Sequence, residues 1–204
     1  LTLDIADAYY LAKNDEKALK SFDAAVRTLK GVTGTEKDGA LARISDGRGM
    51  VYDSRGDYDK AIAEFQQATK LWKEFREPWV RLAVTYDRLG NYDKAIASAN
   101  HAVKELDSEA VVAWVALAQA WTATGDTKQA KVAVAMVKSK DEDLAKRIGS
   151  GLDAWKDAVG KLTREDLKFP LEKELAPAPK QKSQAQSQKS KSKDQEPKAQ
   201  GKPR

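Results

Sequence analysis

The decapeptide Gly-Asp-Tyr-Asp-Lys-Ala-Ile-Ala-Glu-Phe at residues 56–65 returns 34 residues later as Gly-Asn-Tyr-Asp-Lys-Ala-Ile-Ala-Ser-Ala at residues 90–99. A weaker copy, Gly-Asp-Thr-Lys-Gln-Ala, begins 35 residues further on, at Gly125. Self-similarity at this period is typical of stacked helical hairpins, because each hairpin is too small to bury its own apolar face. The repeat therefore predicts an all-α fold in which antiparallel helix hairpins form one superhelical array.

Each copy of the repeat begins with a glycine followed by a small polar residue. A glycine just past a helix adopts the left-handed conformation that ends it, which we expect at Gly56, Gly90 and Gly125. The residues after them, Asp57, Asn91 and Asp126, are of the types that cap the next helix. Small residues such as Ala83 and Ala95 allow the two helices of a hairpin to approach to about 8–10 Å. These stretches are therefore interpreted as hairpin joints rather than as binding sites.

The periodic positions resemble those of the tetratricopeptide repeat (TPR) family, over about residues 1–140. Favoured residue types of that family occur at its large aromatic position (Trp79, Trp114), at its leucine position (Ile5, Leu82, Leu117), at its small position (Ala6, Gly49, Ala83, Ala118), at its second aromatic position (Tyr9, Tyr52, Tyr86, Trp121) and at the small position of the second helix (Ala18, Ala61, Ala95, Ala130). The family's helix-ending proline is replaced by Lys30, Lys73, Asp107 and Glu142. The resemblance implies a right-handed array of about four repeats, in which the first helix of each hairpin lines a concave inner face.

This register divides the chain into units. We expect a degenerate first repeat at 1–30, a loop insertion at 31–41, repeats at 42–75, 76–110 and 111–140, a C-terminal capping helix with a short extension at 141–175, and a disordered basic tail at 176–204. The loop is predicted because Ala18 and Ala61 lie 43 residues apart instead of 34, and an insertion in a repeat array normally forms a surface loop.

An apolar stripe at spacings of three and four predicts one helix over residues 141–162, formed by Leu144, Ile148, Leu152, Trp155, Val159 and Leu162. Such a helix would cover the last apolar face of the array. Two glycines, Gly149 and Gly151, weaken it by about 1 kcal/mol each. The following Thr163-Arg-Glu-Asp166 resembles a capping box.

The net charge of +5 is unevenly distributed along the chain. Residues 176–204 carry a net charge of +6, and the rest of the chain carries −1. The tail is rich in Lys, Gln and Ser and has no aromatic residue to stack on bases, which argues against nucleic acid as the main partner and leaves only a weak tail-mediated contact. The tail is interpreted as a solubilising or tethering extension.

The chain has no cysteine, which excludes a disulfide framework and a thiolate metal site and fits a reducing compartment such as the cytoplasm. An exported form stays open, because the sequence begins with Leu1 and a targeting segment could precede it. No apolar run approaches the roughly 18 to 20 residues that a membrane-spanning helix needs, so we expect no membrane span.

Motifs for catalysis are absent from the sequence. The single histidine, His101, falls on the outer side of a second helix, and no phosphate-binding loop or His-Glu-x-x-His pattern is found. Asp53, Asp57 and Asp59 approach the spacing of a calcium loop, but Tyr58 stands where that loop requires glycine. We therefore expect a protein that is not an enzyme and that has no cofactor and no metal site.

The candidate site is the concave inner face. The register directs eleven residues toward it: Arg43, Asp46, Met50, Asp53, Val80, Arg81, Val84, Asp87, Arg88, Val115 and Gln119. They form an apolar floor edged by arginines and aspartates, which suits an extended segment or an amphipathic helix. The alternative interpretation is that they form ordinary solvated helix faces with incidental ion pairs.

The predicted function is that of a non-catalytic scaffold or adaptor that binds a peptide or helix of a partner protein in this groove. Some TPR domains hold a partner's C-terminal carboxylates with Lys and Asn at set inward positions, but Asp46, Asp53 and Asp87 occupy the groove here and would repel them. Arg43, Arg81 and Arg88 remain able to clamp a single carboxylate or phosphate. The alternative is a regulatory or substrate-recruiting module of a larger enzyme or secretion assembly, and self-association through the terminal repeats is a third possibility.

Overall fold

The computed structural model describes residues 2–167. The end of the predicted short extension, residues 168–175, and the whole predicted basic tail at 176–204 lie outside this range. Its elements, in order, are α1 (Thr2–Leu11), α2 (Asp15–Thr28), α3 (Gly34–Ser54), α4 (Tyr58–Leu71), α5 (Arg76–Arg88), α6 (Tyr92–His101), the π-helical turn η1 (Ala102–Leu106), α7 (Val111–Thr124), α8 (Thr127–Lys140), α9 (Glu142–Ile148) and the 3₁₀ segments η2 (Leu152–Asp157) and η3 (Val159–Lys161). No strand occurs in residues 2–167. The predicted all-α fold is confirmed.

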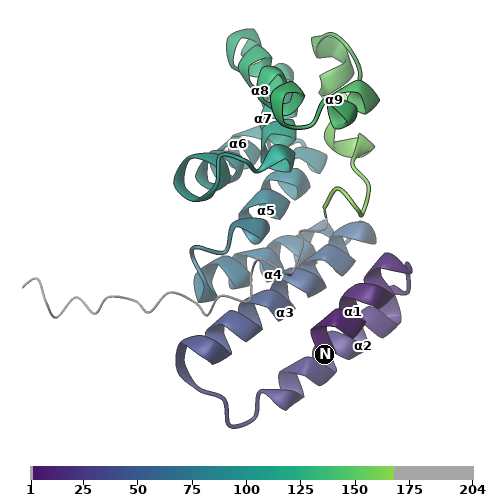
Figure 1. Cartoon of the computed structure of the whole chain (residues 1–204), viewed down its shortest axis with the longest axis vertical. Coiled ribbons are helices and arrows are strands. Elements are labelled where there is room, and N and C mark those ends of the chain that lie inside the picture. The colour runs from purple at the N-terminus through teal and green to yellow at the C-terminus, as the bar shows by residue number, and fades with distance from the viewer. Residues whose placement is uncertain (1, 168–204) are drawn as a thin grey trace, which may run out of the picture.

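Helices that follow one another along the chain pack as hairpins, α1 with α2, α3 with α4, α5 with α6 and α7 with α8. Figure 1 shows the hairpins stacked from α1 and α2 at one end to α8 and α9 at the other. The chain then turns back, and the segment after α9 runs along one side of the stack toward α1 (Figure 1). No helix within residues 2–167 is long and apolar enough to cross a membrane.

The hairpin joints have the predicted backbone. Gly56, Gly90 and Gly125 have φ values of 79°, 70° and 84°, in the left-handed region that a glycine enters without steric cost. Asp126 caps α8 by accepting a hydrogen bond from the backbone N–H of Gln129 at 3.1 Å. Asp57 and Asn91 stand at the cap positions of α4 and α6 but make no side-chain cap hydrogen bond.

The loop predicted at 31–41 is wrong for most of its length, because α3 already begins at Gly34. The insertion adds turns to the front of this helix, which reaches 21 residues against 13 to 14 for α4, α5, α7 and α8. Glu36 in its first turn complements the positive end of the helix. Glu, Lys and Ala at 36, 37 and 40 favour helix, and this preference outweighs the cost of Gly39.

Two glycines of α3 permit close contact with both neighbouring helices. A Cβ atom at Gly47 would lie 2.2 Å from the ring of Phe22 on α2. A Cβ atom at Gly49 would lie 2.4 Å from the ring of Phe65 on α4. Both rings are almost completely buried. The small residues of α3 therefore set how near α2 and α4 can come.

The single helix predicted over 141–162 is also wrong. Helix α9 ends at Ile148, and Gly149 and Gly151 follow with φ values of +119° and +79°. Residues with a side chain rarely adopt such angles, so the two glycines allow a sharp change of chain direction. The remainder of the stripe forms the short 3₁₀ segments η2 and η3 instead of an α-helix.

Candidate partner-binding groove

The predicted inner-face residues lie on α3, α5 and α7, and none of them is exposed. Val80, Val84 and Val115 are fully buried or nearly so. Five polar or charged members are also buried, namely Asp46, Asp53, Arg81, Asp87 and Gln119. Arg43, Met50 and Arg88 are half-buried. We call the surface formed by these eleven residues the groove.

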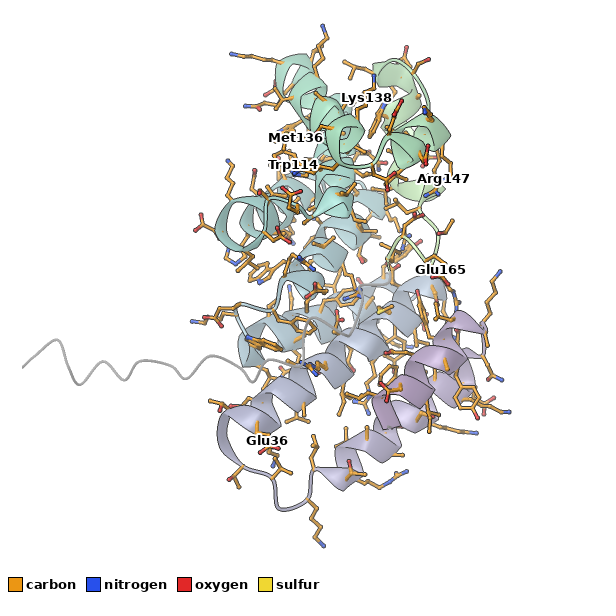
Figure 2. The ribbon with its side chains drawn as sticks, in the orientation of Figure 1. Glu36, Trp114, Met136, Lys138, Arg147 and Glu165 are labelled. Carbon is orange, nitrogen blue, oxygen red and sulfur yellow. The ribbon has the colours of Figure 1, made fainter. Side chains whose placement is uncertain are left out.

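Residues 152–167, which we call the C-terminal segment, cover this groove. Trp155, Val159, Leu162 and Leu167 of the segment belong to one apolar cluster with the groove valines at 80, 84 and 115. Trp155 is completely buried and is the largest side chain in the structure to be so. Figure 2, which labels Arg147 and Glu165, shows the segment leaving α9 and descending toward α1. The groove is thus occupied by the chain itself.

Polar contacts fix the segment at both ends of the groove. The backbone N–H of Val159 donates to Oε1 of Gln119 at 2.8 Å. The guanidinium of Arg81 donates to the backbone carbonyl of Leu167 at 3.0 Å. Both contacts go to backbone atoms of the segment, so they recognise a peptide chain irrespective of its side chains.

A side chain of the segment reaches the first hairpin. Arg164 donates to the carbonyl of Tyr10 and to the carboxylate of Asp15, the latter at 3.1 Å. Its guanidinium also lies 4.5 Å from the centre of the Tyr10 ring, within the range of a cation–π interaction. The space left among Tyr10, Met50, Arg81 and Leu167 measures about 10 Å³, at the lower limit for one water molecule. No room remains there for a further ligand.

Family models and a solved structure agree with the fold. Two models, both described as tetratricopeptide repeat, match residues 1–74 and 47–111, and together they span more than half of the chain. The chain belongs to the tetratricopeptide repeat family. Among solved structures, the TPR protein YrrB, described as having an unusual peptide-binding site, matches with a TM-score of 0.56 and 19% identity over 81% of this chain and 82% of its own. No curated protein matches the sequence.

The TPR register explains a residue whose role the sequence interpretation missed. The indole N–H groups of Trp79, Trp114 and Trp155 each donate to the backbone carbonyl six residues earlier, at 3.1, 2.9 and 3.1 Å. The first two tryptophans hold the large aromatic position of their repeats. Trp155, Ala158, Val159 and Leu162 follow the same intervals as Trp114, Leu117, Ala118 and Trp121. The C-terminal segment thus has the residue spacing of a first helix, and this spacing was visible in the sequence.

The charges of this TPR groove are largely paired. Arg81 forms an ion pair with Asp46, and Arg88 forms one with Asp53. Asp53 also accepts a hydrogen bond from the hydroxyl of Thr85 at 2.8 Å. The clamp by Arg43, Arg81 and Arg88 stays a prediction. In this structure carboxylates hold the guanidiniums of Arg81 and Arg88, and Arg43 lies over the ring of Trp72.

Two groove carboxyls are buried deeply enough to shift their titration. Burial raises the pKa of Asp46 to about 7, against the opposing charge of Arg81. Burial alone raises the pKa of Asp87 to about 8. Neither carboxylate oxygen of Asp87 has a hydrogen-bond partner within the described part of the chain. Asp87 is thus mainly protonated at neutral pH, because an isolated buried charge is costly.

The remaining candidates for chemistry have structural surroundings. His101, expected on the outer side of a second helix, is half-buried, and its ring centre lies 4.1 Å from that of Trp79. Asp53, which began the calcium-like spacing, is used by Thr85 and Arg88. Over residues 2–167, no group of three or more His, Asp or Glu side chains is placed to hold a metal ion.

Proposed function

We propose that this TPR chain is a non-catalytic interaction scaffold whose groove holds a peptide or helix of a partner protein. The observation that carries the proposal is that the groove already holds a peptide segment, residues 152–167. It does so by burying apolar side chains on the valine floor and by hydrogen bonding the backbone through Gln119 and Arg81.

These two kinds of contact are the ones by which grooves bind peptides in general: backbone hydrogen bonds that any chain can satisfy, and pockets that select side chains. Apolar burial supplies most of the free energy at about 25 cal/mol per Å². The paired charges of the groove add no large field of either sign. The proposal therefore favours an apolar partner segment over a strongly charged one.

Site-specific photocrosslinking tests the proposal. A benzoylphenylalanine at Met50, half-buried on the inner face, is compared with one at Lys128, exposed on α8. In extracts of the cells that make this protein, we expect the Met50 position to crosslink to a distinct partner protein and the Lys128 position to give only background. Equal crosslinking from both positions, or none from Met50, would contradict the groove assignment.

Charge reversal at Arg81 would not distinguish loss of recognition from loss of stability. Arg81 is 5% exposed and paired with Asp46, so a glutamate there would place two carboxylates together in the core. Removing one partner of a buried pair costs about 3–5 kcal/mol. Loss of binding would then report on stability rather than on recognition.

A further inference from the structure

The C-terminal segment differs from the helices that it contacts in its backbone hydrogen bonds. Its backbone hydrogen bonds over residues 152–162 are of the i to i+3 type, for example from Ala158 to Trp155 and from Leu162 to Val159, at 3.3 and 3.2 Å. Such 3₁₀ bonds have poorer geometry than those of an α-helix, and runs of them are short. The segment therefore depends on the groove for its order more than α5 or α7 depends on the segment.

The connection to α9 has the features of a hinge. Gly149 and Gly151 both have positive φ and flank the exposed Ser150. Glycine reaches both halves of the φ range at little cost, so this tripeptide can change direction without disturbing α9. The end of α9 before the hinge is held by the bond from the Gly149 N–H to the carbonyl of Ala145, at 3.0 Å.

Few of the polar contacts between the segment and the groove depend on which side chains the segment carries. Gln119 and Arg81 contact its backbone. Its specific features are the apolar side chains at 155, 159, 162 and 167 and the guanidinium of Arg164. A foreign peptide with the same side chains at the same intervals would satisfy the same groups.

We propose that residues 152–167 are an exchangeable internal mimic of the partner. The groove takes a partner segment that has an aromatic side chain, aliphatic side chains four, seven and twelve residues after it, and a basic side chain at the ninth, and the C-terminal segment leaves through the glycine hinge when this partner enters. This inference rests on the proposed function, which it deepens by stating the chemistry of the partner.

Hydrogen exchange on the unmodified full chain is the first test. The N–H of Val159, which is bonded to Gln119, reports on the segment, and the N–H of Leu117 reports on α7. We expect Val159 to exchange at least tenfold faster than Leu117, because the segment opens without unfolding of the array. Equal protection of the two amides would show that the segment leaves only on global unfolding, and would overturn the inference.

The second test uses a fluorescein-labelled synthetic peptide of residues 150–167 as the probe. Its affinity is measured by anisotropy for the wild-type chain, for the double variant Val159→Asp and Leu162→Asp, and for a control with Asp153→Ala and Lys156→Ala. The control residues are exposed and form an ion pair with each other. We expect the double variant to bind the probe at least tenfold more tightly than the wild type, and the control to behave as the wild type does.

The outcomes separate the inference from the proposed function. Equal, measurable affinity for the wild type and the double variant overturns the exchange and leaves the groove function standing. No binding to either chain, with helicity of the double variant intact by circular dichroism, overturns both. If the double variant does not fold, the exchange result on the wild type decides. Light scattering of the wild type could instead show a stable domain-swapped dimer, in which each chain places its C-terminal segment in the groove of the other. The occupant of the groove would then be a second copy of this chain and not another protein.

Discussion

Replacing Trp155 by alanine tests whether the C-terminal segment is truly packed in the groove. The side chain is completely buried and shares its cluster with the valines at 80, 84 and 115. A buried tryptophan removes on the order of 150–250 Å² from water, and truncating one to alanine costs about 3–5 kcal/mol. For a domain of this size each kcal/mol lowers Tm by about 2–4 °C. We therefore expect Trp155→Ala to lower Tm by about 6–20 °C.

Far-UV circular dichroism is the suitable readout, because the other four tryptophans of the chain complicate fluorescence. Urea unfolding of the same variant gives the loss in free energy of unfolding directly. Lys156→Ala is the matched control, since this neighbouring side chain is exposed and its change should remain within about 0.5 kcal/mol. A loss below about 1 kcal/mol for Trp155→Ala would refute the packing described here.

Three further changes test other parts of the structure. Gly49→Ala should destabilise by about 1–3 kcal/mol in urea unfolding through its clash with Phe65, whereas a gain of about 1 kcal/mol from helix propensity would contradict the close approach. The pKa of Asp87 is higher in the folded state than in the unfolded state. The contribution of this carboxyl to the free energy of unfolding is therefore full below about pH 4, and it is lost as the pH rises toward 8, at up to about 1.4 kcal/mol per pH unit. Asp87→Asn should flatten the fall of Tm between pH 5 and 8, and an unchanged slope would exclude burial of that carboxyl. Gln119→Leu leaves the Val159 N–H without its acceptor, at about 1–3 kcal/mol, and should speed its hydrogen exchange, while Gln119→Glu should retain most of the protection.

The repeat made the fold predictable from the sequence. Because Gly90 and Ala95 recur at a fixed offset from Gly56 and Ala61, the hairpin joints and the helix register followed directly. The errors lay outside the repeat. The stretch at 31–41 lacked periodicity, yet its residues from Gly34 onward form the front of α3, because the helix-favouring residues at 36, 37 and 40 outweigh the cost of Gly39.

The groove was only half predictable. Register identifies the side of α5 on which Val80, Val84 and Arg81 lie, but it does not say what covers that side. The spacing of Leu144, Ile148 and Trp155 fits an α-helix well, so the stripe gave no sign that the chain would turn back at Gly149. Partner binding by the groove residues remains a prediction.

Arg164 and Tyr10 lie 154 residues apart in sequence and are in contact. In a repeat array each repeat normally contacts only its neighbours, so the array can extend along its axis and can unfold one repeat at a time. Here the C-terminal segment runs from α9 back to the first hairpin and bonds to it through Arg164, so the first hairpin and the last are coupled. Deleting the first hairpin should therefore destabilise the C-terminal end of the array as well, and breaking the Arg164 contacts should let the whole superhelix extend.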